Sequence, residues 1–486
     1  MKKLYFTAVL SLLAFSAAQA QNTPDSWIHI YTTENGKTRV VTAHSDSVKG
    51  IEYNGSETAG FSKLNYTFLK EGQDKVETFD IDMIDSVEVG PHVPTLIIKT
   101  NTPLDEIKSK DYYEDMTIEV KGYGTFEDLA PYSGTIKGRG NSTWAQFPKK
   151  PYRLKFSKKV SLCGLLKAKS YVLLANFIDP SMLRNAVAFK VGHMIGMPYT
   201  NSSIPVNVIF NGINKGAYQL SEKIGFNDAS LPIEDEEGIL FCLEQDNIDE
   251  IYYSKTPTYG VNYMVKDPDL AEVAETLGTT AQALWQQWKN DFESFERMIP
   301  SGDLTKVFDV ESLVDYVFVY NLTSNQEVQH PKSVYMYKEN IDATYKLGPL
   351  WDFDWAYTFG GSYQEGARQP KELLFTETSK PGSKFFLGLI KNPYIQQQFR
   401  DLYQKKWDAF KEQLPELWDY IDQYAHFMKA SAAENGEIWP TDTYNRQNGR
   451  NIGSTDIFPT HVENLKKWLQ ERINYIDTHK NFGIYQ

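Results

Sequence analysis

The spacing of apolar residues changes along the chain, and this change constrains the fold more than any other feature of the sequence. From Ser26 to Val89, apolar and polar residues alternate, which is typical of strands with one buried face. The segment IPVNVIFNGINKGAYQLSEKI is also strand-like, and its Asn211-Gly212 pair predicts the tight turn of a β-hairpin. The segment TTAQALWQQWKNDFESFERMI and most of the tail from Asn392 have helical spacing. Strands followed mostly by helices predict an α+β fold.

Two helices carry end signals that set their expected boundaries. In DPSMLRNAVAFKVGHMIG, Asp179 is the expected N-cap, Pro180 occupies the first turn and Gly196 ends the helix. This helix is expected to be amphipathic, because four apolar residues fall on one side: Leu183, Val187, Val191 and Met194. Near the C-terminus, Thr460 and Glu463 have the spacing of a capping box.

A loose internal repeat divides the first part of the chain from the rest. The segments IYTTENGKTRVVTAHSDSVKGI and YTFLKEGQDKVETFDIDMIDSVEV share a strand, a Gly turn, a second strand and an Asp-Ser-Val ending. We therefore expect a small β-repeat domain over 21–90. The GPHVP segment breaks the pattern and predicts a linker. The remainder, 95–486, is expected to form the main domain.

The N-terminal 20 residues predict export from the cytoplasm. They begin with Lys2-Lys3, continue with an apolar run and end in small residues, as in a cleavable secretory signal peptide. No Cys for lipid attachment follows, and no later stretch is apolar for long enough to cross a membrane. We expect a secreted or periplasmic protein, or one on the cell surface. Its formal net charge of -13 argues against binding to nucleic acid. Only Cys163 and Cys242 are present, and the sequence leaves their pairing open.

The stretch IKGRGNSTWAQFPKKPYRLKF, residues 136–156, has the composition of a phosphate-binding loop. Its glycines allow backbone N–H groups to approach an anion, and Asn141, Ser142 and Thr143 offer side-chain donors. Lys150 or Lys155 would neutralise phosphate charge. An ordinary polar hairpin with solvated lysines explains the same residues, and a Gly-rich loop taken alone favours that alternative.

A second cluster predicts a divalent metal site. In YKLGPLWDFDWAYTFGG, Asp352 and Asp354 stand among Trp and Phe residues, and their spacing on an extended strand places both carboxylates on one face. Buried carboxylates need a partner, and Mg²⁺ typically binds one or two carboxylates together with substrate phosphates. A pair of capping Asp residues in a tight turn is the alternative.

A third cluster lies on the loop NQEVQHPKS, between the two others in the sequence. It brings Asn325, Glu327, His330 and Lys332 close together just before a strand. Phosphoryl transfer requires such groups, because a carboxylate must orient or deprotonate the acceptor hydroxyl near the metal. The cluster thus makes Asn325, Glu327 and Lys332 candidate catalytic residues.

Taken in order, these blocks resemble the spore-coat protein H (CotH) kinase family. The resemblance covers roughly Thr95 to Gly361, through five segments: IKGRGNSTWAQFPKKPYRLKF, KSYVLLANFIDPSMLRNAVAF, NGINKGAYQLSEKI, HPKSVYMYK and GPLWDFDWAYTFG. It implies an atypical protein-kinase-like fold with a β-rich N-lobe over about 95–260 and a helical C-lobe over about 261–486. It also implies binding of ATP with Mg²⁺ or Mn²⁺ and phosphorylation of Ser or Thr on secreted or surface proteins.

The resemblance assigns roles to single residues. The GRGNSTW block, with Arg139, Asn141 and Ser142, is similar to the family's nucleotide loop, and Lys155 to its strand lysine. Glu222 would be the acidic partner of that lysine, as in the Lys-Glu ion pair of kinases. Asp352 resembles the metal-binding Asp, with Asp354 as a second ligand or a structural neighbour. One residue departs from the pattern, because Glu327 stands where many members have Asp, and a longer carboxylate changes reach and angle.

Two other functional classes remain open from the sequence. The first is a cell-envelope binding or adhesion protein that keeps the kinase-like scaffold with little catalysis. Its groove would use the aromatic residues, which make up 14% of the chain and alternatively pack the core. The second treats Asp352 and Asp354 as the metal motif of a glycosyltransferase or a phosphatase. Trp355-Ala356 disfavours the phosphatase, whose motif has Thr or Val soon after the second Asp.

Overall fold

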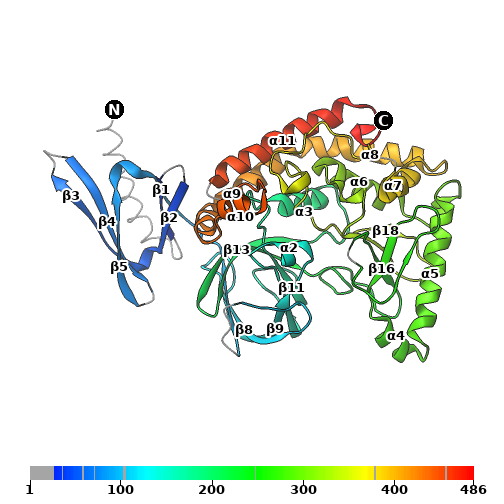
Figure 1. Ribbon diagram of the computed structural model, residues 1–486, viewed down its shortest axis with the longest axis horizontal. Helices are drawn as coiled ribbons and strands as arrows, with labels where there is room; N and C mark the ends of the chain where they lie inside the picture. The colour runs from blue at the N-terminus through cyan, green and yellow to red at the C-terminus, as the bar shows by residue number, and fades with distance from the viewer. Residues whose placement is uncertain are drawn as a thin grey trace.

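The computed structural model describes residues 27–34, 37–56, 60–70, 72–101, 106–246, 248–376, 379–454 and 457–486. The predicted signal peptide, residues 1–20, lies outside them. The observed mixture of sheets and helices confirms an α+β fold. Figure 1 shows a small β domain at one end, and beside it two β regions below a layer of helices. None of the helices in the described part of the chain combines the length and apolar character needed to span a bilayer.

The small domain pairs the strands of its two repeats across each other. Each repeat forms two strands, a short 3-10 helix and a third strand. The third strand of each repeat joins the hairpin of the other, so that the sheets have the orders β2-β1-β6 and β3-β4-β5. The strands are β1 Trp27–Glu34, β2 Lys37–His44, β3 Val48–Ser56, β4 Gly60–Lys70, β5 Gln73–Asp80 and β6 Ile84–Gly90.

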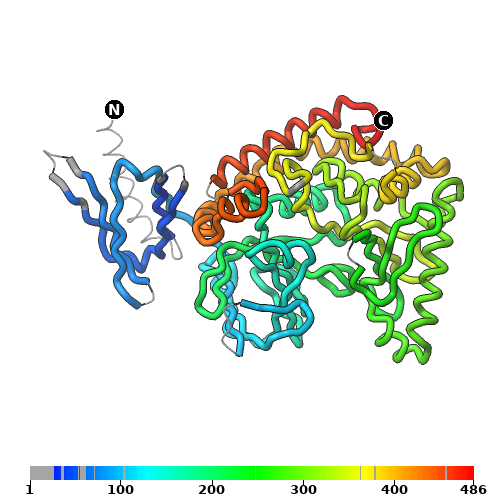
Figure 2. Tube along the Cα trace, viewed as in Figure 1, coloured from blue at the N-terminus to red at the C-terminus, as the bar shows by residue number. Residues whose placement is uncertain are grey.

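The small domain rests on the C-terminal helices (Figure 2). Lys429, on a long helix of the main domain, forms an ion pair with Glu88 and lies 4.1 Å from the ring centre of Tyr31. Trp27 stacks on His92 with ring centres 4.3 Å apart. These contacts join the first strand to the linker and to the helical layer.

The first β region of the main domain is a closed barrel with the strand order β10-β11-β13-β12-β7-β8-β9. Its core is apolar. The predicted hairpin turn is confirmed, because Phe210 pairs with Ile213, and Asn211 and Gly212 have positive φ angles of 48° and 80°. The strands are β7 Thr95–Thr100, β8 Glu114–Lys121, β9 Leu129–Gly138, β10 Tyr152–Val160, β11 Ala168–Leu174, β12 Ser203–Phe210 and β13 Ile213–Glu222.

The second β region is an antiparallel sheet with the order β15-β16-β14-β17-β18, called here the β14–β18 sheet. The lobe boundary expected near residue 260 falls inside this sheet, because strands lie on both sides of it in the sequence. Cys163 in the barrel region and Cys242 in this sheet are both buried and free, which answers the question of their pairing. The strands are β14 Ile239–Leu243, β15 Tyr253–Lys255, β16 Asn262–Asp267, β17 Val334–Lys338 and β18 Lys346–Leu347.

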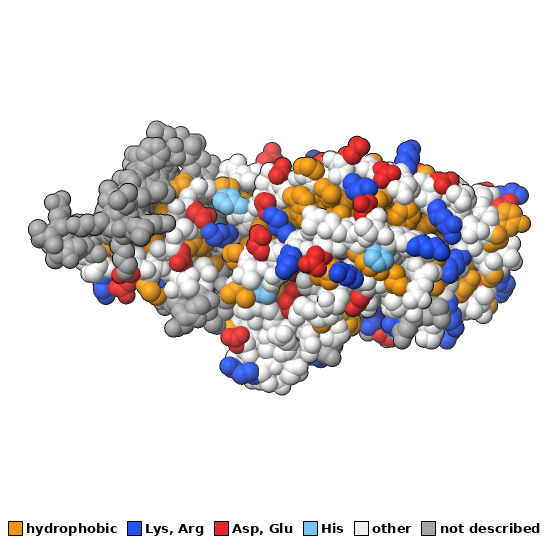
Figure 3. Space-filling model, turned by 90° about the horizontal axis from the view of Figure 1, so that it is seen from above, with side chains coloured by type: hydrophobic (Ala, Val, Ile, Leu, Met, Phe, Trp, Pro, Cys, Tyr) orange, Lys and Arg blue, Asp and Glu red, His pale blue; other side chains and the backbone are white. Residues whose placement is uncertain are grey.

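The helices form the upper layer and flank the β14–β18 sheet (Figure 1). Seen from above, acidic, basic and apolar side chains are mixed over this face, with several basic ones toward the end away from the small domain (Figure 3). The helices are α2 Ser142–Gln146, α3 Arg184–Met194, α4 Leu270–Leu277, α5 Ala281–Met298, α6 Val310–Thr323, α7 Pro381–Lys391, α8 Gln396–Glu412, α9 Leu414–Ile438, α10 Thr441–Asn448 and α11 Phe458–Thr478.

Two predicted helix starts are wrong, for different reasons. The Asp179 carboxylate accepts N–H bonds from Ser181 at 3.0 Å and Arg184 at 2.9 Å, which close a turn before α3 begins at Arg184. Every residue from Arg184 to Phe189 is buried, so α3 is a central helix and not an amphipathic one. Helix α11 begins at Phe458 with Pro459 in its first turn, which places Thr460 inside the helix and removes the capping box.

Candidate active site

A pocket of about 530 Å³ joins the barrel, α3 and the β14–β18 sheet. It brings together three clusters that the sequence separates: the loop after β9, the loop before β17 and the segment around Asp352. Eight residues singled out from the sequence line it: Arg139, Asn141, Ser142, Thr143, Glu327, Lys332, Asp352 and Asp354. Five others do not line it: Asn325, His330, Lys150, Lys155 and Glu222.

Asp352 and Asp354 form the acidic wall of this pocket. The extended strand expected here is wrong, because residues 352–354 form no strand and Asp352 has a left-handed backbone, with φ 65°. The Asp352 carboxylate accepts a bond from the Ser333 hydroxyl at 3.2 Å. Burial raises its pKa, against the attraction of Arg139. Asp354 is 9% exposed, and burial together with the charge of Asp352 raises its pKa to about 7. The pair therefore lies in an environment that disfavours two negative charges without a cation.

Glu327 faces the same acidic wall from the loop before β17. It lies in a one-turn 3-10 helix, Gln326–Val328. Its Oε2 atom is buried and has no hydrogen-bond partner within the described part of the chain. Burial, followed by the charge of Asp352, raises its pKa well above the usual range, while Lys332 acts in the opposite direction. An unpartnered carboxylate oxygen at a pocket wall is available to a substrate or a cation.

Asn325 is a positioning residue and not part of the pocket surface. Its side chain is fully buried, accepts the N–H of Glu327 at 3.1 Å and donates to the Asp352 carbonyl at 3.1 Å. A single amide thus connects the backbone of the Glu327 turn to that of Asp352. Asn325 therefore does not reach the pocket itself. Its two hydrogen bonds hold together the backbone segments that carry the Glu327 and Asp352 carboxylates.

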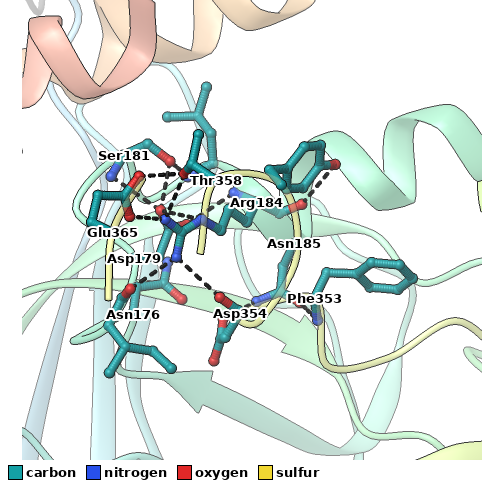
Figure 4. A network of polar contacts seen from close by, with 12 residues as sticks. Asn176, Asp179, Ser181, Arg184, Asn185, Phe353, Asp354, Thr358 and Glu365 are labelled. Carbon is teal, nitrogen blue, oxygen red and sulfur yellow. Dashed lines mark hydrogen bonds and ion pairs between the residues drawn. The ribbon is translucent and has the colours of Figure 1, made fainter. Parts of the chain in front are cut away.

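Helix α3 holds Asp354 through its first two residues, Arg184 and Asn185 (Figure 4). The Asn185 side chain donates to the Asp354 carboxylate at 2.5 Å and accepts the N–H of Phe353 at 2.8 Å. Arg184 donates to the Asp354 carbonyl at 3.0 Å and forms an ion pair with Glu365. Since Arg184 is fully buried and Asp179 lies beside it, this network anchors the segment carrying Asp354 to the start of α3.

We predict that Asn185→Leu raises the Mg²⁺ concentration needed for half-maximal nucleotide binding by about 10- to 100-fold, as for other residues that orient metal ligands. The reason is that Asp354 loses its donor, while Leu has similar volume. Isothermal titration with Mg²⁺ at saturating ATP measures this.

Asn176→Leu is the matched control, because Asn176 is a buried neighbour whose amide donates instead to Gln219 at 3.2 Å. Equal effects of the Asn185 and Asn176 substitutions would show that Asn185 only stabilises the fold.

Three cationic side chains line the same pocket: Arg139, Lys110 and Lys332. Arg139 follows β9, and its guanidinium lies 5.5 Å from the ring centre of Trp351. Lys110 donates to the Asn141 side chain at 3.3 Å. Lys332 forms an ion pair with Asp246 at 2.7 Å and lies 5.9 Å from the ring centre of Trp355. Arginine suits phosphate well, because its planar group donates two parallel hydrogen bonds.

The predicted Lys155–Glu222 pair is not formed, and strand register explains why. Lys155 pairs with Ser170 and Glu222 pairs with Tyr171. Directly paired residues share a face, whereas consecutive residues alternate, so Lys155 and Glu222 lie on opposite faces of the barrel wall. Lys155 is exposed and lies 5.8 Å from the ring centre of Tyr113, outside the pocket.

Glu222 and Lys150 also have structural partners instead of a nucleotide. Glu222 is buried and accepts the N–H of Ser202 at 3.0 Å. Lys150 donates to the carbonyls of Trp144 at 2.7 Å and Phe147 at 2.6 Å. Its ammonium group therefore helps to shape the turn after α2.

We predict that Arg139→Ala weakens ATP binding by about tenfold or more, because removing one charge-assisted bond to phosphate costs roughly 1.5–3 kcal/mol. Lys155→Met is expected to change ATP affinity less than about twofold, because Lys155 lies outside the pocket. A tenfold loss of affinity would correspond to about 1.4 kcal/mol of binding free energy. Fluorescence titration with an ATP analogue measures both affinities. The reverse order of effects would restore Lys155 as the phosphate-binding cation.

The described residues contain no group of three or more His, Cys, Asp or Glu side chains arranged to hold a metal ion. Mg²⁺ needs no such group, because it usually binds one or two carboxylates together with phosphate oxygens and water. The raised pKa values of Asp352 and Asp354 fit a site completed by a cation. The donors present are therefore compatible with Mg²⁺ or Mn²⁺ bound together with a nucleotide.

The sequence did not identify Glu244, Asp246 or Asn185, although all three line the pocket. Glu244 and Asp246 follow the buried strand β14, and carboxylates placed just after a buried strand were a signal that could have identified them. Glu244 accepts the N–H of Ser333 at 3.2 Å, and Asp246 contacts His330 at 2.8 Å. Asn185 lacked a signal of its own, because one polar residue in an apolar helix is normally structural.

An α+β fold with cations and carboxylates lining one pocket defines a candidate phosphoryl-transfer protein. The family model described as CotH kinase protein matches residues 136–476. The chain therefore belongs to the CotH kinase family. A search of curated proteins finds no match to the chain.

Proposed function

We propose that the protein is a secreted or periplasmic protein kinase that transfers the γ-phosphoryl group of ATP to Ser or Thr of secreted or surface proteins. The observation that carries this proposal is the pocket that Arg139 and the Asn141-Ser142 loop line together with Glu327, Asp352 and Asp354. Family membership adds support. Export is proposed from the sequence of residues 1–20.

The residues that line or support the pocket have different roles in this transfer. Arg139 and the loop donors bind the phosphates, and Asp352 and Asp354 would hold Mg²⁺ or Mn²⁺, which supplies positive charge next to the transferring group. Glu327 accepts the proton of the acceptor hydroxyl. The hydroxyl oxygen of the Ser or Thr then bonds to the γ-phosphorus, and the bond from that phosphorus to the ADP oxygen breaks. Asn325 and Asn185 keep the carboxylates in place.

Thermal unfolding with Mg-ATP tests nucleotide binding and has a defined pH dependence. The folded protein raises the pKa of Asp354 from 3.8 to about 7, mainly by burial. The protonated carboxyl therefore stabilises the fold fully below about pH 4, and this contribution is lost as the pH rises through about 7. Since protons compete with the cation, we predict a larger rise in Tm on adding Mg-ATP at pH 8 than at pH 6.

Asp354→Asn is the control, because ATP itself also titrates in this range. We expect the difference between the two pH values to shrink in this variant. No response of Tm to Mg-ATP at either pH would favour the alternative, a cell-envelope binding or adhesion protein on a kinase-like scaffold. An equal pH dependence in the parent and in Asp354→Asn would remove Asp354 from the cation site.

A further inference from the structure

A second pocket, of about 510 Å³, adjoins the candidate active site. Ala145 and Gln146 of α2 line both pockets. The second one lies between the turn after α2 and the corner that joins α9 to α10. We call it the aromatic groove, after the rings and prolines that line it: Phe147, Pro148, Phe177, Trp439, Pro440 and Tyr444.

The walls of the aromatic groove are preformed. The rings of Phe147 and Phe177 are 5.5 Å apart, and those of Phe177 and Tyr444 are 5.4 Å apart. The indole N–H of Trp439 donates to the Lys215 carbonyl at 2.9 Å, which fixes this ring at the helix corner. The apolar part of the lining is therefore formed before a ligand enters, which lowers the entropy cost of binding.

An aromatic wall continues from the groove into the candidate active site. Phe147 packs edge-on against Tyr363 with ring centres 5.6 Å apart, and Tyr363 stacks on Trp355 at 5.5 Å. Tyr363 and Trp355 both line the pocket that contains Asp352 and Glu327. An extended ligand can thus occupy the groove while one of its groups reaches the carboxylates.

The polar groups of the groove suit the backbone of a peptide. Gln146, Gln447 and Asn448 are exposed at its edge, and amide side chains both donate and accept hydrogen bonds, as peptide groups do. Its described lining includes neither Asp nor Glu, although the chain has a formal net charge of -13. The groove accordingly presents no negative charge to an acidic ligand.

We propose that the aromatic groove binds an extended, uncharged or acidic segment of the acceptor polypeptide, with proline or another apolar residue beside the Ser or Thr that is phosphorylated. Grooves lined by aromatic rings suit polyproline-type segments, whose extended shape is already formed in solution. A sugar chain is less suited, because its many hydroxyl groups need several acceptors, and the described lining offers three amide side chains but no carboxylate. Phosphorylation of the bound segment rests on the proposed kinase function, whereas binding of a peptide in the groove does not.

The experiment uses the full chain with two peptide libraries. One has a central Ser with random flanking positions and is scored for phosphate transfer from Mg-ATP; the other has Ala in place of Ser and is scored for binding without nucleotide. Gln447→Trp is designed to fill the groove from α10, and Arg446→Trp is the matched control, exposed on the same helix but outside the groove.

We expect the Ala library to select proline or apolar residues at a fixed distance from its centre. Gln447→Trp should weaken binding of the selected peptides by tenfold or more, and Arg446→Trp by less than twofold. Neither substitution should alter the affinity for Mg-ATP. Thr443→Trp, which also fills the groove, replaces Gln447→Trp if that variant is less stable than the control.

The outcomes separate the groove from the kinase activity. Selective peptide binding without any phosphate transfer would support the groove as a peptide site and contradict the proposed kinase function. Transfer without sequence selection, or equal effects of the two Trp variants, would contradict the groove as a peptide site. Binding of β-linked oligosaccharides, lost in Gln447→Trp and with no peptide selected, would also overturn it in favour of a glycan.

Discussion

Asp352→Asn is expected to weaken binding of Mg-ATP by about 100-fold or more while leaving the fold intact. The neutral amide cannot replace a carboxylate in charge, and the charge stabilisation that such a metal provides is typically several kcal/mol, with about 1.4 kcal/mol for each factor of ten. Asn is preferred to Ala because residue 352 has a φ of 65°, a conformation that Asn adopts readily. Isothermal titration of Mg-ATP measures the loss.

The control is Asp228→Asn, a carboxylate that is exposed and paired with Lys159 on the surface. It should bind Mg-ATP as the parent does. If Asp352→Asn remains folded and keeps the parent affinity, Asp352 does not belong to the nucleotide site.

Glu327→Gln is expected to slow phosphate transfer by about 100- to 10,000-fold, the usual range for loss of a general base. Mg-ATP affinity should change little, because this group acts on the acceptor hydroxyl and not on the nucleotide. The carboxylate oxygen Oε2 of Glu327, which is buried and has no partner among the described residues, explains both expectations, since Gln preserves the shape of the side chain and removes its proton affinity. Single-turnover transfer measured beside nucleotide titration separates the two quantities.

Glu327→Asp tests the departure from the family pattern. The shorter carboxylate is the one common in the family, and we expect it to retain part of the transfer rate or to raise it. Glu471→Gln, an exposed substitution on α11, should leave both quantities unchanged. Unaltered transfer in Glu327→Gln would end the catalytic assignment of this residue.

The residues of the candidate site were predictable where polar side chains with a shared chemistry cluster in the sequence. Asp352 and Asp354 among aromatic residues, Glu327 before a strand and Arg139 in a Gly-rich loop were singled out, and the fold brings all four to one pocket. Their assembly depends on long-range packing between the barrel and the β14–β18 sheet, which local patterns do not contain.

Predictions that depended on register or context were less successful. Whether Lys155 and Glu222 meet depends on the pairing of three strands, and the observed register places them on opposite faces. Helix α3 starts later than predicted because the Asp179 carboxylate accepts the N–H of Arg184, closes the turn before the helix and pairs with the Arg184 side chain. Asn185 was missed because its importance comes from Asp354, a residue far away in the sequence.

Transfer of labelled γ-phosphate from ATP tests the central claim most directly. The full chain is incubated with ATP and Mg²⁺ or Mn²⁺, with acceptor peptides or proteins present, beside Asp352→Asn and Glu327→Gln. We predict metal-dependent labelling of Ser or Thr that is lost in Asp352→Asn and reduced by about 100-fold or more in Glu327→Gln. Labelling that persists in both variants, or nucleotide binding by the parent without transfer to any acceptor or to the chain itself, would contradict the assignment as a kinase.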